Sequence, residues 1–193
     1  MRSEKALQLP NNRQKLLLHT CCAPCCGGII ETLLENEIDF TLFFYNPNIH
    51  PQEEYELRKN EIKRFADKKN IAFVDADYDP DTWLSRVHGL DAEPERGARC
   101  SICFDIRLGR TAKYADKHGF DVFATSLGIS RWKDLEQVNQ SGLRAVPEYS
   151  DTVFWPHNWR KDEGSLRSIA TAKQENFYRQ KYCGCVYSQY RKI

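Results

Sequence analysis

No apolar run in this chain approaches the roughly 18 residues that a membrane-spanning helix needs. Residues 1–14 are polar and charged, so they lack the apolar core of a secretory signal. The 193 residues also contain no internal repeat, no low-complexity tract and no interdomain linker. We therefore expect a cytoplasmic protein with no membrane partner, built as a single domain over residues 1–193 with a flexible N-terminal segment at residues 1–14.

The chain also lacks a large net charge, since 28 basic and 27 acidic residues leave it at +1. With 41% hydrophobic and 28% charged residues, it has the composition of an ordinary globular protein and not of a disordered one. Basic residues still concentrate after residue 106 and in the last third of the chain. Such runs are usually solvated helix faces. A basic face for nucleic acid is the alternative, and charge alone does not decide between them.

Cysteine is abundant and falls into three tight clusters. The eight cysteines lie in the segments Cys21–Cys26, Cys100–Cys103 and Cys183–Cys185. Because cytoplasmic thiols are kept reduced, cysteines at such close spacing indicate metal binding or catalysis before structural disulfides.

Strand and helix patterns alternate along the chain. Short apolar runs predict strands at residues 15–20, 40–45, 71–74, 121–126 and 153–155. Helical spacing and start signals predict helices at residues 28–35, 51–69, 100–117, 132–143 and 164–182, with a short helix opened by residues 79–81. This alternation predicts an α/β fold with a mostly parallel sheet flanked by helices.

Parallel α/β folds bind ligands beyond the carboxyl ends of their strands, where the strand order reverses. The first cysteine cluster follows the first predicted strand, and Thr125 and Ser126 end the fourth. We expect these two strands to be neighbours, with the active site at their carboxyl ends.

The pair Cys22 and Cys25 lies between a strand and a helix, as in thioredoxin-like redox motifs. A helix N-terminus favours the thiolate, which suits either redox chemistry or metal ligation. The adjacent Cys21 and the two further clusters argue against simple thioredoxin chemistry. A cytosolic thiol–disulfide oxidoreductase remains one alternative for the function.

The spacing of Cys100 and Cys103 is common in zinc and iron–sulfur sites. Together with Cys21 and Cys22 it provides four thiolates, and this ligand set alone does not distinguish tetrahedral zinc from a [4Fe–4S] cluster. If the thiolates bind zinc, the second alternative for the function is a non-enzymatic zinc-containing RNA-binding module.

The glycine between Cys183 and Cys185 lets the backbone bring two thiols close together. Such a pair suits redox cycling better than structural bridging, although metal ligation by one or both thiols is the alternative. Cys26 is expected to have a packing role.

Five segments together carry a family resemblance. They are residues 19–25, 100–107, 125–130, 158–161 and 178–185. In their order and content, they resemble the cobalamin-independent epoxyqueuosine reductases over nearly the whole chain. The resemblance implies a fold similar to the adenine-nucleotide alpha-hydrolase-like (Rossmann-like) domains of tRNA-thiolating enzymes. It also implies reduction of the epoxide of epoxyqueuosine in the anticodon loop of tRNA to give queuosine, with an electron donor as a further partner.

The resemblance also implies cofactors and ligands. Cys21, Cys22, Cys100 and Cys103 would hold a [4Fe–4S] cluster, and Cys25 would bind an additional mononuclear iron beside it. Cys183 and Cys185 would be the redox-active pair. All seven assignments are expectations that follow from the matching motifs.

Other residues are candidates for supporting roles. We expect His19 to be a core or outer-shell histidine more than a catalytic acid, with His157 as another possible proton donor. Asp105 is expected to pair with Arg107, to cap backbone or to donate a proton. Candidates for stacking on tRNA bases are Trp132, Trp159 and Tyr182, and candidates for phosphate contacts are Arg131, Lys133, Arg160 and Lys161.

Overall fold

A single parallel sheet organises the protein. The structure is a computed structural model that describes residues 6–146, 148 and 150–189. The strands are β1 (Lys15–His19), β2 (Asp39–Phe44), β3 (Phe73–Asp75), β4 (Val122–Thr125) and β5 (Val153–Phe154). They lie in the order β3-β2-β1-β4-β5, and every neighbouring pair is parallel. This confirms the predicted parallel sheet, with the first and fourth strands as neighbours.

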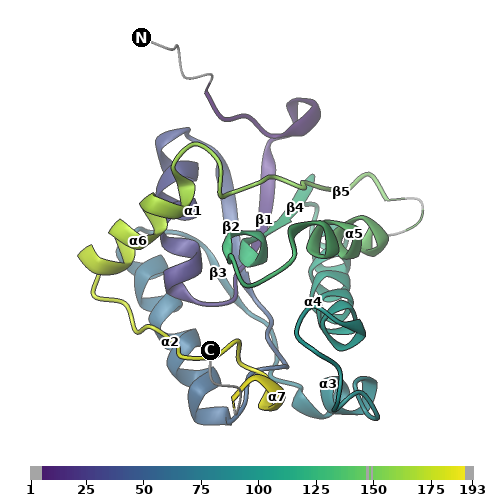
Figure 1. Cartoon of the computed structure of the whole chain (residues 1–193). Helices are drawn as coiled ribbons and strands as arrows, with labels where there is room; N and C mark the ends of the chain where they lie inside the picture. The colour runs from purple at the N-terminus through teal and green to yellow at the C-terminus, as the bar shows by residue number, and fades with distance from the viewer. Residues whose placement is uncertain (1–5, 147, 149, 190–193) are drawn as a thin grey trace.

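Helices cover both faces of the sheet (Figure 1). They are α1 (Ala23–Glu35), α2 (Gln52–Lys68), α3 (Pro80–Arg86), α4 (Ala98–Lys117), α5 (Leu135–Ala145), α6 (Gly164–Gln174) and α7 (Val186–Gln189). One core lies between the sheet and α1, α2 and α6, and the other between the sheet and α4. The predicted α/β architecture is therefore confirmed.

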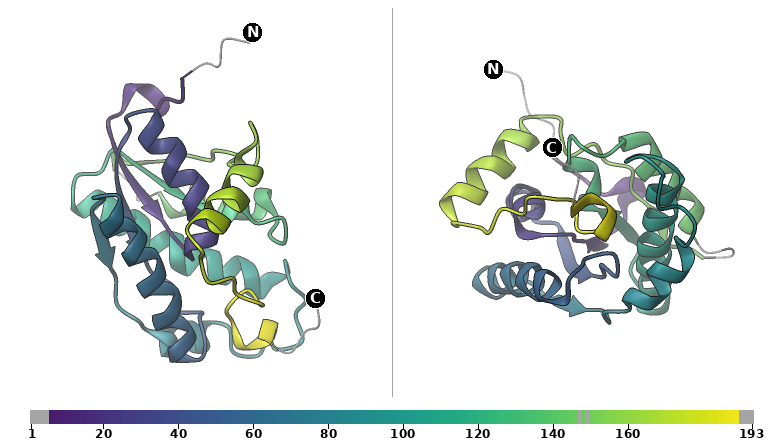
Figure 2. Two further views of the ribbon diagram at one scale, coloured as in Figure 1. Left: turned by 90° about the vertical axis from the view of Figure 1, so that its left-hand side faces the viewer. Right: turned by 60° about the horizontal axis from the view of Figure 1, so that its bottom comes forward.

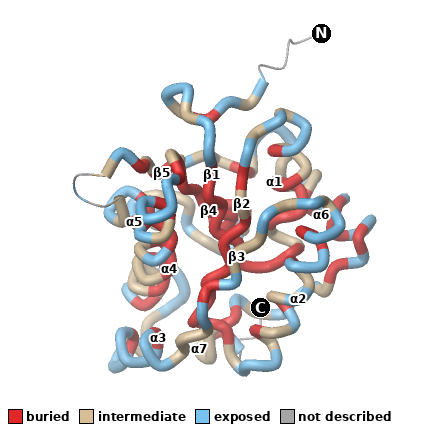
Figure 3. The backbone as a smooth tube through the Cα atoms, turned by 180° about the vertical axis from the view of Figure 1, so that it is seen from behind, coloured by how far each residue is buried: buried red, intermediate tan, exposed pale blue. Residues whose placement is uncertain are grey.

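Alternation along β1 explains the two cores. Leu16 and Leu18 point into the core on the α1 side, whereas Leu17 points into the core on the α4 side. All three are fully buried, because a central parallel strand is covered on both faces. Figure 3 shows that β1, β2 and β4 are mostly buried, whereas the outer faces of the helices are exposed. No helix among the described residues is long and apolar enough to cross a membrane.

The described part of the predicted flexible segment packs on the domain. Leu9 is buried in the core on the α1 side, and the backbone N–H of Leu7 donates to Oδ1 of Asn36 at 2.7 Å. Residues 1–5, the rest of that segment, lie outside the described residues.

Two predicted helix limits were wrong in ways that affect the site. α1 begins at Ala23 and not at residue 28, with Pro24 in its first turn, so Cys25 and Cys26 are helical. The last long helix ends at Gln174 and not at residue 182, because Asn176 adopts a left-handed conformation with φ 51°. The chain from residue 175 to α7 then crosses the carboxyl ends of the strands (Figure 2).

Candidate active site

A cavity of about 740 Å³ lies at the carboxyl ends of β1 and β4. Its walls come from the start of α1, the start of α4, the loop after β4 and the crossing segment around residue 183. Seven of the eight cysteines line it, namely Cys21, Cys22, Cys25, Cys100, Cys103, Cys183 and Cys185. The three sequence clusters therefore meet at one place, as the strand pattern predicts for an active site.

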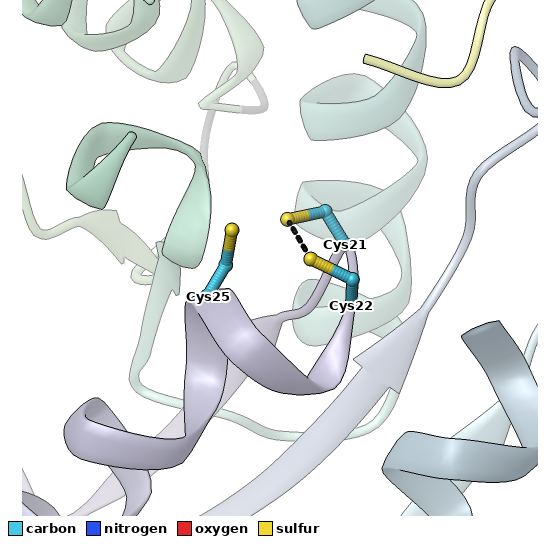
Figure 4. A group of neighbouring side chains, drawn as sticks. All are labelled: Cys21, Cys22 and Cys25. Carbon is cyan, nitrogen blue, oxygen red and sulfur yellow. Dashed lines mark hydrogen bonds between the residues drawn. The ribbon is translucent and has the colours of Figure 1, made fainter. Parts of the chain in front are cut away.

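The first cluster forms a compact thiol triad. The Sγ atoms of Cys21, Cys22 and Cys25 all lie within 4.8 Å of one another, and those of Cys21 and Cys22 are 3.7 Å apart. Figure 4 shows the three sulfurs pointing into the same space, with Cys22 at the N-cap of α1 and Cys25 in its first turn. Thiolates on one tetrahedral metal ion with bonds of about 2.3 Å lie about 3.8 Å apart. The triad therefore fits ligation of a soft metal.

The triad concentrates negative charge on one sulfur. Hydrogen bonds from the thiols of Cys22, Cys25 and Cys26 hold the pKa of Cys21 well below its ordinary value. The same contact with Cys21 raises the pKa of Cys22 to about 12. A positive metal centre relieves this competition, because it stabilises several thiolates at once.

Cys100 and Cys103 face the triad from the first turn and a half of α4. Cys103 is buried, which raises the pKa of its thiol to about 12, and Cys100 is half-buried. The backbone N–H of Arg96 donates to Sγ of Cys100 at 3.3 Å. Two thiol pairs across a roomy cavity are a donor set that suits soft iron–sulfur centres, and hydrogen bonds to sulfur are a usual feature of such sites.

The last two cluster residues differ in surroundings. Cys183 is exposed, whereas Cys185 is half-buried and packs beside Trp83, Val87 and Cys103. All eight cysteines are free thiols in the structure. Cys26 is fully buried among the core residues on the α1 side, in the packing position expected for it.

Lys133 brings positive charge to the cavity. It is half-buried in the cavity wall. Burial by itself would lower its pKa, but attraction to negative charge on the sulfurs of Cys183, Cys21 and Cys25 outweighs burial and raises the pKa above the ordinary value. Lys133 therefore shares the cavity with the cysteines, and its expected contact with a phosphate stays a prediction. Lys133 is thus a cation in the same cavity as the cysteine sulfurs.

His19 is a buried neutral histidine. Its Nδ1 accepts from the Thr125 hydroxyl at 2.8 Å, and its Nε2 donates to the Tyr45 carbonyl at 3.2 Å. Burial, helped by the charge of Arg107, lowers its pKa to about 3. The ring ties β1 to β4 beneath the cysteines, so the expected core role describes it better than acid catalysis.

Asp105 has a different partner from the one expected. It forms an ion pair with Arg144 of α5 at 2.8 Å, whereas Arg107 is buried and donates to Oδ1 of Asn46. The expected pairing of Asp105 with Arg107 is therefore wrong, because the two side chains leave α4 on different faces.

The three aromatic residues expected to stack on tRNA bases differ in burial and position. Trp132 is 51% exposed and lines the cavity mouth, whereas Trp159 is buried in the core on the α1 side. Tyr182 lines the cavity, and its hydroxyl donates to the His50 carbonyl.

The basic residues expected to contact phosphates also differ from one another. Arg160 donates to the carbonyls of Ser130 and Lys133 and so holds the loop after β4. Arg131 and Lys161 are exposed.

Two residues at the site were missed by sequence reasoning. Nε2 of Gln180 donates to Sγ of Cys22 at 2.9 Å, while Oε1 of Gln180 is buried with no hydrogen-bond partner among the described residues. Arg58 of α2 donates hydrogen bonds to the carbonyls of Cys183 and Tyr182. Gln180 lies three residues before Cys183, and that proximity was the available signal. No sequence signal pointed to Arg58, because it lies in a helix that is rich in charged residues.

Comparison with known proteins gives one consistent family. The sequence profile described as Epoxyqueuosine reductase QueH matches residues 16–191. The protein of that name from Acinetobacter baylyi is 57% identical over 182 residues, covering 94% of this chain and 84% of the relative. The protein of that name from Haemophilus influenzae is 56% identical, and the match covers 94% of this chain and 74% of the relative. The Thermotoga maritima protein is 32% identical, covering 90% and 89%.

A solved structure shares the fold. The U34-tRNA thiolase NcsA from Methanococcus maripaludis, determined with its [4Fe-4S] cluster, superposes with a TM-score of 0.55 at 13% sequence identity. The match covers 91% of this chain and 61% of that one. At this identity the likeness concerns the fold alone, and it agrees with the expected similarity to the fold of tRNA-thiolating enzymes.

Proposed function

Because the chain belongs to the Epoxyqueuosine reductase QueH family, we propose that it reduces the epoxide of epoxyqueuosine in tRNA to the alkene of queuosine. The reaction takes two electrons and two protons and releases the epoxide oxygen as water. The enzyme is an oxidoreductase, and its substrate is the modified base in the anticodon loop. The observation that carries the proposal is the convergence of seven cysteines on one cavity in a chain of this family.

Four thiolates hold a [4Fe–4S] cluster in this proposal, namely Cys21, Cys22, Cys100 and Cys103. Cys25 contributes to the site of an additional iron next to it. The common cavity, the close sulfurs of the triad and the donors to Cys22 and Cys100 support this assignment. When bound, the centre supplies electrons one at a time, and an iron with an open position acts as a Lewis acid toward the epoxide oxygen.

The residues of the chain supply positive charge and are the source of both electrons. The ammonium group of Lys133 lines the same cavity and would stabilise negative charge that develops on the epoxide oxygen. The thiols of Cys183 and Cys185 give up two electrons and two protons as they close to a disulfide. The overall change is then balanced, because the epoxide and the dithiol become the alkene, water and the disulfide.

Contacts with tRNA fall at the cavity mouth. The exposed ring of Trp132 offers a stacking surface for an unpaired base, and the guanidinium carbon of Arg131 lies 4.7 Å from the centre of that ring. Arg179 and Lys181 are exposed cations that also line the cavity. Phosphate contacts by these side chains make binding weaken steeply as salt increases. Binding that is insensitive to salt would contradict this placement.

The direct test is turnover without oxygen. The holoprotein is mixed with tRNA that carries epoxyqueuosine and with dithionite, and the digested nucleosides are separated and weighed by mass spectrometry. We expect loss of epoxyqueuosine and gain of queuosine with wild-type protein and with Cys26→Ala, whose altered side chain lies in the core. Cys103→Ala should be inactive. Unchanged tRNA in the presence of fully iron-loaded wild-type protein would refute the function.

A further inference from the structure

The two thiols of the Cys183–Cys185 pair are not equivalent. Cys183 is exposed at the mouth of the cavity. Cys185 is half-buried against Trp83 and Cys103, and its thiol lies 3.4 Å from the Ser188 hydroxyl. Thiol–disulfide exchange requires a thiolate to reach one particular sulfur, so access decides which sulfur is attacked. A large reductant therefore reaches the sulfur of Cys183 more easily than the sulfur of Cys185.

Hydrogen bonds from Arg58 fix the backbone around Cys183. Nη1 and Nη2 of Arg58 donate to the carbonyls of Cys183 and Tyr182 at 3.0 and 3.2 Å. The Arg58 side chain is only 3% exposed, and its Nε donates to Glu54 at 2.7 Å. Because the guanidinium group binds the carbonyls and leaves the sulfur alone, it orients the loop without covering the Cys183 thiol.

The turn between the two cysteines is equally restricted. Gly184 has φ 128°, a conformation that other residues rarely adopt, and its carbonyl accepts from the backbone N–H of His50 at 2.8 Å. A Cβ at this position would come within 3.0 Å of Ile49 Cγ1. The loop is thus held so that one thiol faces solvent and the other faces Cys103.

We propose that Cys183 is the entry thiol of the pair, the sulfur that a dithiol protein reductant attacks, and that Cys185 is the inner thiol. This rests on the proposed function, in which the pair cycles between dithiol and disulfide. The reductant thiolate bonds to Sγ of Cys183, the Cys183–Cys185 bond breaks, and Cys185 leaves as a thiolate that takes up a proton. The second reductant thiol then attacks its own partner sulfur and releases Cys183. The reductant loses two electrons, and the pair gains them.

The test compares two single-thiol enzymes. Cys185→Ser and Cys183→Ser, both iron-loaded and reduced, are mixed without oxygen with a thioredoxin that keeps one active-site cysteine, activated as its mixed disulfide with thionitrobenzoate. Capture of the probe by an enzyme thiolate is the reverse of the step that releases Cys183 from the mixed disulfide. The faster thiol is therefore the one that forms the mixed disulfide with the reductant. We expect Cys185→Ser to form the enzyme–thioredoxin disulfide at least about tenfold faster than Cys183→Ser. Faster capture by Cys183→Ser would overturn the proposal.

A second measurement needs no substitution. Reduced wild-type holoprotein is alkylated briefly with N-ethylmaleimide, and labelled peptides are quantified by mass spectrometry. Label should appear on Cys183 before Cys185, and the reverse order would overturn the proposal.

Failure of the underlying redox function has a different signature. If the oxidised wild-type protein contains no Cys183–Cys185 bond and both serine variants turn over normally, the pair is not redox-active, whatever the order of thiol access. That result contradicts the redox role and the entry-thiol proposal together.

Discussion

Nε2 of Gln180 donates a hydrogen bond to Sγ of Cys22 at 2.9 Å, and so links the crossing segment to the proposed cluster. Hydrogen bonds to ligand sulfurs raise the reduction potential of iron–sulfur centres. We expect Gln180→Leu, which keeps the bulk and loses the donor, to lower the midpoint potential and to reduce turnover about 10- to 100-fold.

The potential is measured by redox titration followed by electron paramagnetic resonance. Gln174→Leu, at an exposed position on α6, is the matched control and should leave the potential unchanged. An unaltered potential in Gln180→Leu would show that this bond does not act on the cluster.

Arg58 and Glu54 form a buried ion pair, with side chains 3% and 11% exposed. Arg58→Met removes the cation, which leaves two backbone carbonyls without their donor and the Glu54 carboxylate with only the Tyr178 hydroxyl. We expect the free energy of unfolding to fall by about 3 kcal/mol. Lys63→Met breaks an exposed pair with Asp67 on the same helix and should cost about 0.5 kcal/mol or less. Urea unfolding monitored by circular dichroism measures both, and equal losses would contradict the role assigned to Arg58.

Trp132 should contribute to tRNA binding and little to stability. Stacking of one base on an aromatic ring contributes about 1–3 kcal/mol, so Trp132→Ala should weaken tRNA binding about tenfold or more. Leu143 is equally exposed, at 51%, but does not line the cavity, so Leu143→Ala is the control. Fluorescence anisotropy with labelled tRNA compares the variants. Equal affinity in all three proteins would remove Trp132 from the interface.

His157 gives the fold a sensitivity to acid. Burial, partly offset by the charge of Asp162, lowers the pKa of His157, whose ring packs between Trp155 and Trp159. Below about pH 6.5, the unfolded chain therefore binds a proton more readily than the folded protein does. This contribution to stability is complete above that pH and is lost as the pH falls.

The free energy of unfolding, measured by urea denaturation between pH 8 and pH 5, should therefore decrease toward acid. His157→Gln should be less stable than wild type at pH 8, because ring contacts are lost, but should have a shallower dependence on pH. A slope as steep as that of wild type would mean that another group is responsible.

The cysteines should separate by role. Cys21→Ala, Cys22→Ala, Cys100→Ala and Cys103→Ala should each lose iron and sulfide, because each removes a proposed thiolate ligand. Cys26→Ala should keep both, although it loses some core packing. Metal analysis of proteins purified without oxygen provides the comparison. Full iron in any of the first four would remove that residue from the ligand set.

The sequence was sufficient to predict the elements that form the core. Leu16, Leu17 and Leu18 form a continuous apolar run, which is the pattern of a central parallel strand, and the polar ends of β1 and β4 indicated where the site lies. Local patterns sufficed here, because burial on both faces leaves an unambiguous signal.

The same reasoning could not predict contacts between residues that are far apart in the sequence. Arg58 and Lys63 look alike in a charged helix, and only the path of residues 182–184 makes one buried and leaves the other exposed. Likewise, the helical pattern beyond Gln174 continues in the sequence, but Phe177 is buried in the core and Asn176 turns the chain toward it. Tertiary packing overrides helix propensity at that point.

The most direct test of the account is the iron, sulfide and zinc content of wild-type protein purified without oxygen, together with its visible spectrum. We expect about four irons and four sulfides per chain, one additional iron and a brown colour from cluster absorption. A colourless protein with one zinc and no sulfide, or one with no metal, would contradict the claim that these cysteines build an iron–sulfur active site.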